Sequence, residues 1–165
     1  MTTLIATTPE GVAIQELADL VKGCAAFQEA CQKEGEPETT LDQHVHYPLT
    51  REGVPEFYPF AVLTHGESSR RRFADGTSLP RGTVNLFIGR LMANPDDWKG
   101  EEIAYTNFEG AIIAEIEQAS GTGGHFVWEL QQIEPPSRTD PRQEAGGRAC
   151  PGYYESVYAC EWSVE

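Results

Sequence analysis

The chain has 165 residues, of which 39% are hydrophobic and 23% are charged, and its formal net charge is −14 at pH 7. This length and composition predict one globular domain with a core of its own and exclude a disordered chain. So large a negative charge also argues against non-specific nucleic-acid binding, which requires positive charge to displace the phosphate counterions.

The N-terminus and the cysteines indicate the compartment. The segment MTTLIATTPEG has neither the basic start nor the long apolar run of a secretory signal. No part of the sequence approaches the ~20 consecutive apolar residues of a membrane span. We therefore expect a protein made and used in a cytoplasm, without membrane association. The cysteines are then expected to be reduced, structural thiols: Cys24, Cys31, Cys150 and Cys160.

The first predicted element is a helix that begins at Pro9 and ends before Gly35 and Pro37. Thr8 is a suitable N-cap, and proline suits the first helical position. Apolar residues recur at steps of three and four, so one stripe of this helix is predicted to face the core. The stripe consists of Leu17, Leu20, Cys24, Phe27 and Cys31.

Strands are predicted next, in HVHYP (44–48) and in FYPFAVLTHGES (57–68). The segment RRRFADGTSLPRGTVNLFIGRLM (70–92) predicts a β-hairpin, because Asp75 and Gly76 form a typical turn pair and the residues after the turn alternate. We expect this hairpin, over about 66–90, to project from the domain. Two sets of its residues are expected on opposite faces: Val84, Leu86 and Ile88 on one, and Thr83, Asn85 and Phe87 on the other.

The second half of the chain predicts a helix over 93–121, a strand over 125–133, a long turn-rich loop over 134–152 and a last strand over 153–164. Gly110 lies in the middle of the helix, where it would permit close packing. The order α-β-β-β-α-β-β predicts an α+β fold in which two helices pack on one face of a mainly antiparallel sheet. Expected core residues are Leu17, Phe27, Phe108, Ile112, Trp128 and Trp162.

Few residues suggest chemistry. His44 and His46 alternate on a predicted strand, so their rings would share a face as metal ligands do, with His65 or His125 as further ligands. A polar sheet face or a subunit contact explains the pair as well. The glycine-rich GTGGH (121–125) follows a helix, whereas phosphate-binding loops precede one. Because no catalytic motif is present, we expect neither an enzyme nor a bound metal or cofactor.

Positive charge gathers in one place. Residues 70–90 carry five arginines and one aspartate, a net charge of +4, so the other residues sum to −18. Four of these arginines lie closest to the predicted turn of the hairpin: Arg70, Arg71, Arg72 and Arg81.

The order of the elements resembles a known family. The segments GCAAFQEAC, HVHYP, YPFAVLTHGE, the hairpin, YTNFEGAIIAEIE and the C-terminal YYESVYACEWSV follow one another as in the tail terminator and tail-completion proteins of the neck of long-tailed bacteriophages. The resemblance covers residues 8–165 and leaves the loop 134–152 unmatched, and it implies that residues 1–165 form one such domain. It implies a virion protein, assembled in the host cytoplasm, that forms a ring of about six copies.

That resemblance also implies partners. Such a ring caps the tail tube and docks to the head-side connector, and DNA passes through its centre without specific binding. An acidic lumen would repel the phosphate backbone. The four hairpin arginines are then expected to contact a neighbouring subunit or the tail tube. Two alternatives stay open: a head-completion or connector protein of the neck, and a small metal-binding module or enzyme that uses His44 and His46.

Overall fold

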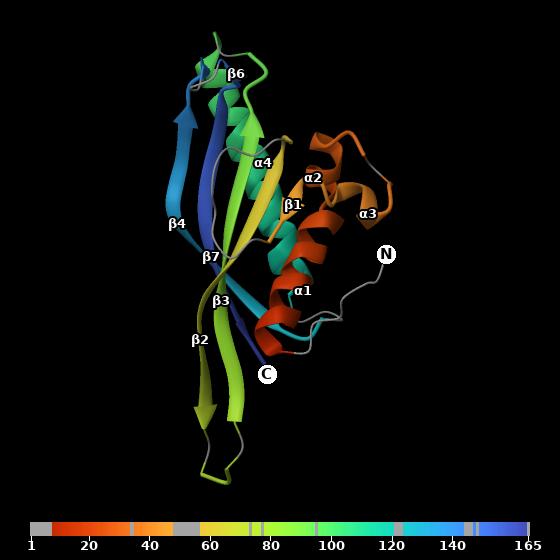
Figure 1. Cartoon of the computed structure of the whole chain (residues 1–165), viewed down its shortest axis with the longest axis vertical. Coiled ribbons are helices and arrows are strands. Elements are labelled where there is room, and N and C mark those ends of the chain that lie inside the picture. The colour runs from red at the N-terminus through yellow and green to blue at the C-terminus, as the bar shows by residue number, and fades with distance from the viewer. Residues whose placement is uncertain are drawn as a thin grey trace.

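The computed structural model describes residues 8–33, 35–47, 57–72, 74–76, 78–94, 96–120, 124–143, 147 and 149–164. Its elements, drawn in Figure 1, are α1 (Pro9–Gly23), α2 (Ala25–Ala30), α3 (Glu38–Leu41), β1 (Val45–His46), β2 (Phe60–Arg72), β3 (Ser78–Leu91), α4 (Trp98–Ala119), β4 (Val127–Thr139), β5 (Arg142–Gln143), β6 (Ala149–Cys150) and β7 (Tyr153–Ser163). No helix among these residues is long and apolar enough to cross a membrane.

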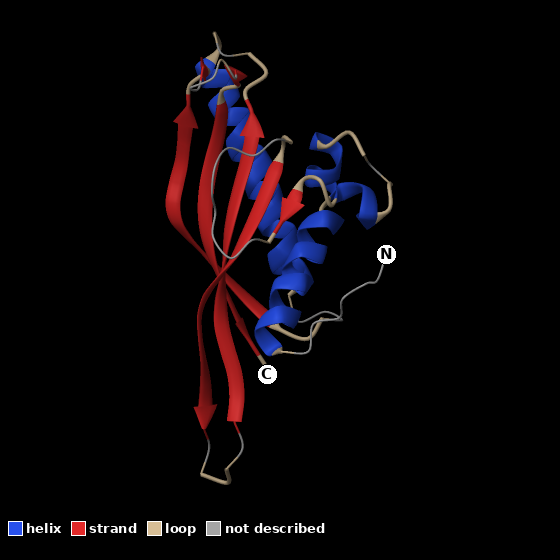
Figure 2. Ribbon diagram, in the orientation of Figure 1, coloured by secondary structure: helices blue, strands red, loops and turns tan. Residues whose placement is uncertain are grey.

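Five strands form one sheet in the order β1-β2-β3-β7-β4. The short β1 pairs with β2 in parallel, and the other neighbours pair antiparallel. Figure 2 shows the helices gathered on one side of this sheet. The predicted α+β fold with a mainly antiparallel sheet is therefore confirmed, and the sheet has one face packed on helices and one outer face.

The first helix begins as predicted, but it does not run unbroken to Gly35. The hydroxyl of Thr8 accepts a hydrogen bond from the Gly11 N–H at 3.1 Å. At Cys24 the backbone is extended (φ −68°, ψ 124°), which separates α1 from α2. The Ala25 N–H, freed by the break, is bound at 2.9 Å by the carboxylate of Glu115 on α4. A tertiary contact thus replaces a bond within the helix, and the predicted stripe stays buried or half-buried.

The core lies between the helices and the inner face of the sheet. Val84, Leu86 and Ile88 are fully buried, as their alternation predicted. On β3 the indole of Trp162, the residue opposite on β7, lies directly over Gly82, where an added Cβ would come within 2.7 Å of a ring atom. Only a glycine leaves room for the indole at that position. All six residues expected in the core are buried: Leu17, Phe27, Phe108, Ile112, Trp128 and Trp162.

One end of the outer face is covered by aromatic side chains. Phe60 and Val62 of β2 and Tyr153 of β7 are buried there, with Tyr58 and Phe87 packed against them. The Phe60 ring lies across the backbone of Gly89 on β3, 2.1 Å from the position of an added Cβ. The remainder of the outer face, toward the hairpin, lies outside this aromatic cluster.

The prediction of a loop over 134–152 is wrong, because most of the described residues in this range lie in strands. Strand β4 continues to Thr139, with irregular pairing to β7 around Pro135 and Pro136, and β5 and β6 pair with each other. The prolines predicted a loop because they cannot donate to a strand ladder. They are tolerated here because β4 is an edge strand, where a missing N–H breaks no sheet bond on the open side. Residues 144–146 and 148 lie outside the described chain.

Candidate functional site

The predicted hairpin is present, and it forms a two-stranded arm. Strand β7 pairs with β3 only as far as Arg81, which lies opposite Ser163. The pairing of β2 with β3 continues beyond this point, from Arg70 opposite Pro80 to the turn that contains Gly76, whose φ is +87°. Figure 1 shows this arm projecting past α1 and past the end of β7. The arginine-rich end of the hairpin therefore lies outside the body of the domain.

The structure places all four predicted arginines on this arm. Arg70 lies on β2 and its guanidinium is 4.0 Å from the carboxylate of Glu10 on α1. Arg81 lies on β3, is exposed, and donates from Nε to the hydroxyl of Ser69 across the strand pair at 3.2 Å. For Arg71 and Arg72 the backbone alone is described: they pair with Leu79 and Ser78.

Beside the base of the arm lies an uncovered part of the outer sheet face, which we call the outer strip. It consists of residues whose side chains point away from the helices, on β3, which continues into the arm, and on β7 and β4 beside it. Glu129 on β4 lies directly opposite Glu161 on β7, and Glu161 lies opposite Thr83 on β3. The outer strip consists of Thr83, Asn85, Glu129, Gln131, Ala159 and Glu161, all of them exposed or half-buried.

The outer strip carries uncharged side chains at its centre and two carboxylates at the end near the arm. Glu129 and Glu161 form no ion pair with any described residue. Two like charges directly opposite each other on neighbouring strands destabilise a sheet by a few tenths of a kcal/mol to about 1 kcal/mol. The strip therefore carries negative charge that the described part of this chain leaves uncompensated.

The two histidines expected on one strand face differ in their burial. His44 precedes β1, in the turn after α3, and is buried, whereas His46 is exposed. The Nδ1 of His44 lies 2.8 Å from the carbonyl oxygen of Pro59, so in this contact the ring donates. Burial lowers the pKa of His44 below its usual value. His44 and His46 thus differ in exposure, and the described residues contain no group of three or more His, Cys, Asp or Glu placed to hold a metal.

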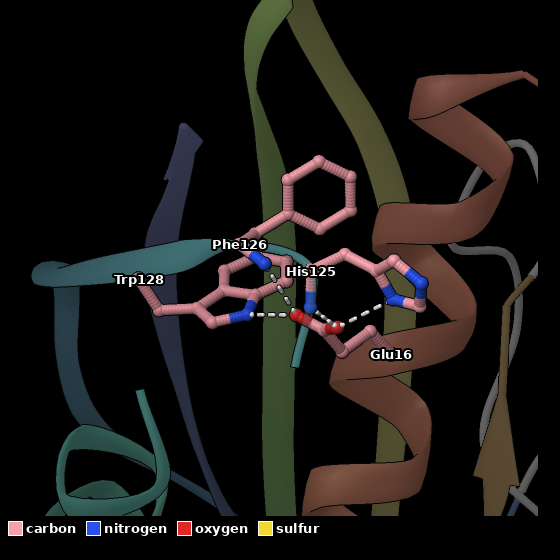
Figure 3. Close-up of polar contacts among 4 residues, drawn as sticks. All are labelled: Glu16, His125, Phe126 and Trp128. Carbon is pink, nitrogen blue, oxygen red and sulfur yellow. Dashed lines mark hydrogen bonds and ion pairs between the residues drawn. The ribbon is translucent and has the colours of Figure 1, made fainter. Parts of the chain in front are cut away.

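A carboxylate that the sequence did not point to joins the first helix to β4. Figure 3 shows Glu16 of α1 reaching the segment that enters β4. Its oxygens accept the backbone N–H of His125 at 2.5 Å and of Phe126 at 3.3 Å, and the indole N–H of Trp128 at 2.9 Å. The Nδ1 of His125 lies 3.2 Å from the same carboxylate. The segment GTGGH thus ends in a structural contact to α1.

A second buried carboxylate lies between α4 and the sheet. Glu109 accepts hydrogen bonds from the hydroxyl of Tyr158 at 2.6 Å and from the hydroxyl of Ser156. The Tyr105 hydroxyl lies 2.6 Å from that of Ser156 and donates to the Ile88 carbonyl at 2.9 Å. Burial, the largest cause, raises the pKa of both tyrosines, so both stay neutral. These groups satisfy one another inside the core.

Among the described residues, cavities border the helices at two places. The first, of about 380 Å³, opens beside Glu16 and His125 and is lined by α1 residues and Ala119. The second, of about 460 Å³, lies between α2 and α4 over Phe108 and is lined largely by alanines. In the first, the bonds of Glu16 are directed to the backbone and the indole around it. In the second, Arg90 stacks over the Phe108 ring at 5.3 Å. Both arrangements bind the elements of the domain together.

Three cysteines are buried free thiols, which confirms the prediction for them. Burial raises the pKa of Cys160 to about 12 and that of Cys31 to about 11, and it raises the pKa of Cys24 as well. These thiols are therefore protonated and unreactive at neutral pH. The side chain of Cys150 lies outside the described residues.

No protein-family model matches the chain, and no curated protein matches it. Among solved structures, a chain of the virion of a native gene transfer agent (GTA) particle is similar in its backbone. The TM-score is 0.47, the sequences are 8% identical, and the alignment covers 96% of this chain and 99% of that one. A likeness this distant assigns no function to the chain.

Proposed function

We propose that this chain is a structural protein of a virion, the tail terminator of a long-tailed bacteriophage. In this role about six copies form a ring that caps the tail tube and meets the head-side connector. DNA passes through the ring, and the protein works through its contacts rather than through a reaction at a catalytic site.

The observation that carries the proposal is the arm. A two-stranded, arginine-bearing ribbon projects beyond α1 and β7 from a domain whose other residues are strongly acidic. A chain that assembles head to tail needs two different and complementary surfaces, and a projecting basic element on an acidic body supplies them. The order of the sequence elements, which resembles that of phage neck proteins, supports the same role.

The acidic body suits a conduit for DNA. The residues outside 70–90 sum to a charge of −18, and a negatively charged wall repels the phosphate backbone instead of binding it. The arm arginines would then have to face a protein and not the lumen. A ring with its arms in the lumen would hold the DNA.

The first test is the mass and shape of the purified full chain. We expect native mass spectrometry, from low to high micromolar concentration, to show a closed oligomer of about six copies. Negative-stain microscopy should show rings with an open centre. A chain that stays monomeric over this range, or that forms particles without an open centre, would overturn the proposal.

A further inference from the structure

We propose that the arm of one copy docks on the outer strip of the next copy, with the arm arginines against Glu129 and Glu161. The inference rests on the proposed function, because it states which two surfaces make the ring contact. Its partner is a second copy of this chain.

The arginines at the tip of the arm lie far from the carboxylates of the strip in the same chain. Along β3, Pro80 and Ser78, which lie opposite Arg70 and Arg72, are three and five residues before Thr83, which lies opposite Glu161. A strand advances by about 3.3 Å per residue, so the tip arginines start about 10–17 Å beyond Glu161 along the same straight ribbon. The backbone of the arm tip is therefore well separated, within one chain, from the carboxylates of the strip.

Arg81, at the base of the arm, lies beside the strip but is bonded to a different strand. It is a diagonal neighbour of Glu161, since the two lie opposite Ser163 and Thr83. The Nε of Arg81 nevertheless bonds to Ser69 on β2, and no ion pair joins Arg81 to Glu161. The described chain therefore leaves both the arginine fork and the two carboxylates available to another molecule.

The centre of the strip carries no aromatic or branched apolar side chain. At its centre Asn85, Ala159 and Gln131 lie side by side across β3, β7 and β4, and none of these side chains is bulky. The aromatic cluster of Phe60 and Tyr153 rises at the other end of the same face. The arm of a neighbouring copy would lie on the side chains of Asn85, Ala159 and Gln131. Its arginines would then contact the carboxylates at the end of the strip near the arm.

Charge and symmetry favour a second copy as the occupant. Arm and strip are different surfaces of one chain, so their contact is heterologous and leaves an arm and a strip free at the two ends of every assembly until a ring closes. Opposite charges across such a contact set its register and speed association. Nucleic acid could occupy the arm but not the strip, because the strip is acidic.

The test exchanges the charges between chains. The arm variant carries R70E/R71E/R72E, the strip variant carries E129R/E161R, and a control carries E102R/E117R, which reverses two exposed glutamates on α4. Circular dichroism checks that each variant folds. Sedimentation velocity then measures the concentration at which each chain assembles, at low and high salt.

We expect the arm and strip variants each to require at least about tenfold more protein than the wild type to assemble. The control should assemble as the wild type does. An equimolar mixture of the arm and strip variants should assemble again, because the acidic arm of one fits the basic strip of the other. Restoration in the mixture cannot come from a contact within one chain. High salt should weaken the wild-type assembly.

Five outcomes bear on this inference and on the proposed function. Rings that form equally well in all variants, or a mixture that stays dissociated, would overturn the docking of arm on strip and leave the ring. Charge-dependent open chains would support the docking and overturn the closed ring. No assembly of the wild type would overturn both. An arm variant that assembles normally but no longer binds duplex DNA would show that the arm contacts nucleic acid, and it would overturn the inference.

Discussion

The contact between Glu16 and the start of β4 leads to a sharp prediction for stability. Glu16→Ala removes a carboxylate that accepts two backbone N–H groups and the indole N–H of Trp128. The side chain of Glu16 is only 12% exposed, so water reaches these donors poorly once the carboxylate is gone. The substitution should therefore loosen α1 from the segment that enters β4.

The expected loss follows from the three donors. The N–H of His125 is on an exposed residue and can bond to water, so its loss contributes little. The N–H of Phe126 and the indole N–H of Trp128 are part-buried. A buried donor left without a partner costs about 1–3 kcal/mol. Allowing for water entry through the neighbouring cavity, we expect Glu16→Ala to lower the free energy of unfolding by about 2–4 kcal/mol.

Urea unfolding followed by far-UV circular dichroism measures this change. Gln15→Ala is the matched control, because Gln15 precedes Glu16 on α1 and lines the same cavity; its effect should stay within about 0.5 kcal/mol. Glu16→Gln keeps one acceptor oxygen and should fall between the two. Amide exchange at Phe126 and Trp128 should speed up in Glu16→Ala. If Glu16→Ala is no less stable than Gln15→Ala, the contact does not hold α1 to the sheet.

Two further predictions concern glycines and pH. Gly89→Ala should destabilise the fold by about 1–3 kcal/mol, because its Cβ would meet the Phe60 ring, whereas Gly110→Ala, whose Cβ meets nothing within 4 Å on the exposed side of α4, should stabilise it by about 0.5–1 kcal/mol. The unfolding temperatures of both variants test this prediction. Equal shifts in the two variants would refute the close packing of Phe60 on Gly89. His44 is buried and its pKa is lowered by burial, so its contribution to stability is present above its unfolded pKa of about 6.5 and is lost as pH falls below that value. His44→Asn can still donate to Pro59 but does not titrate, so unfolding midpoints from pH 7.5 to 5 should fall less steeply in this variant than in the wild type, and parallel profiles would refute the role of His44.

Local patterns in the sequence predicted the parts of the fold that depend on neighbours along the chain. The cap at Thr8, the buried stripe of the first helix and the alternation of Val84, Leu86 and Ile88 each follow from spacing alone. The turn at Asp75 and Gly76 likewise located the arm. The expectation that Gly110 permits close packing is wrong, because that side of α4 faces open space.

Contacts between distant residues explain what the sequence could not predict. The break at Cys24 is stabilised by Glu115, which is 90 residues away from Ala25. Pro135 and Pro136 predict a loop from the sequence alone, and a strand is compatible with them only because β4 lies at the edge of the sheet. The outer strip has no sequence signature, because Glu129 and Glu161 meet only when the register of β4 with β7 is fixed. The arm was thus predictable from the sequence, and the surface that complements it was not.

The position of β7 constrains the order in which this protein can fold. Strand β7 lies between β3 and β4, although both precede it in the chain. Until residues 153–163 are in place, the main sheet consists only of β1, β2 and β3, and β4 has no partner in it. Closing the sheet therefore requires pairing across some 60–80 residues, which is slow compared with hairpin formation. During synthesis the apolar inner face stays open until the last strand emerges from the ribosome, so this is the period in which the nascent chain is most exposed to misassembly.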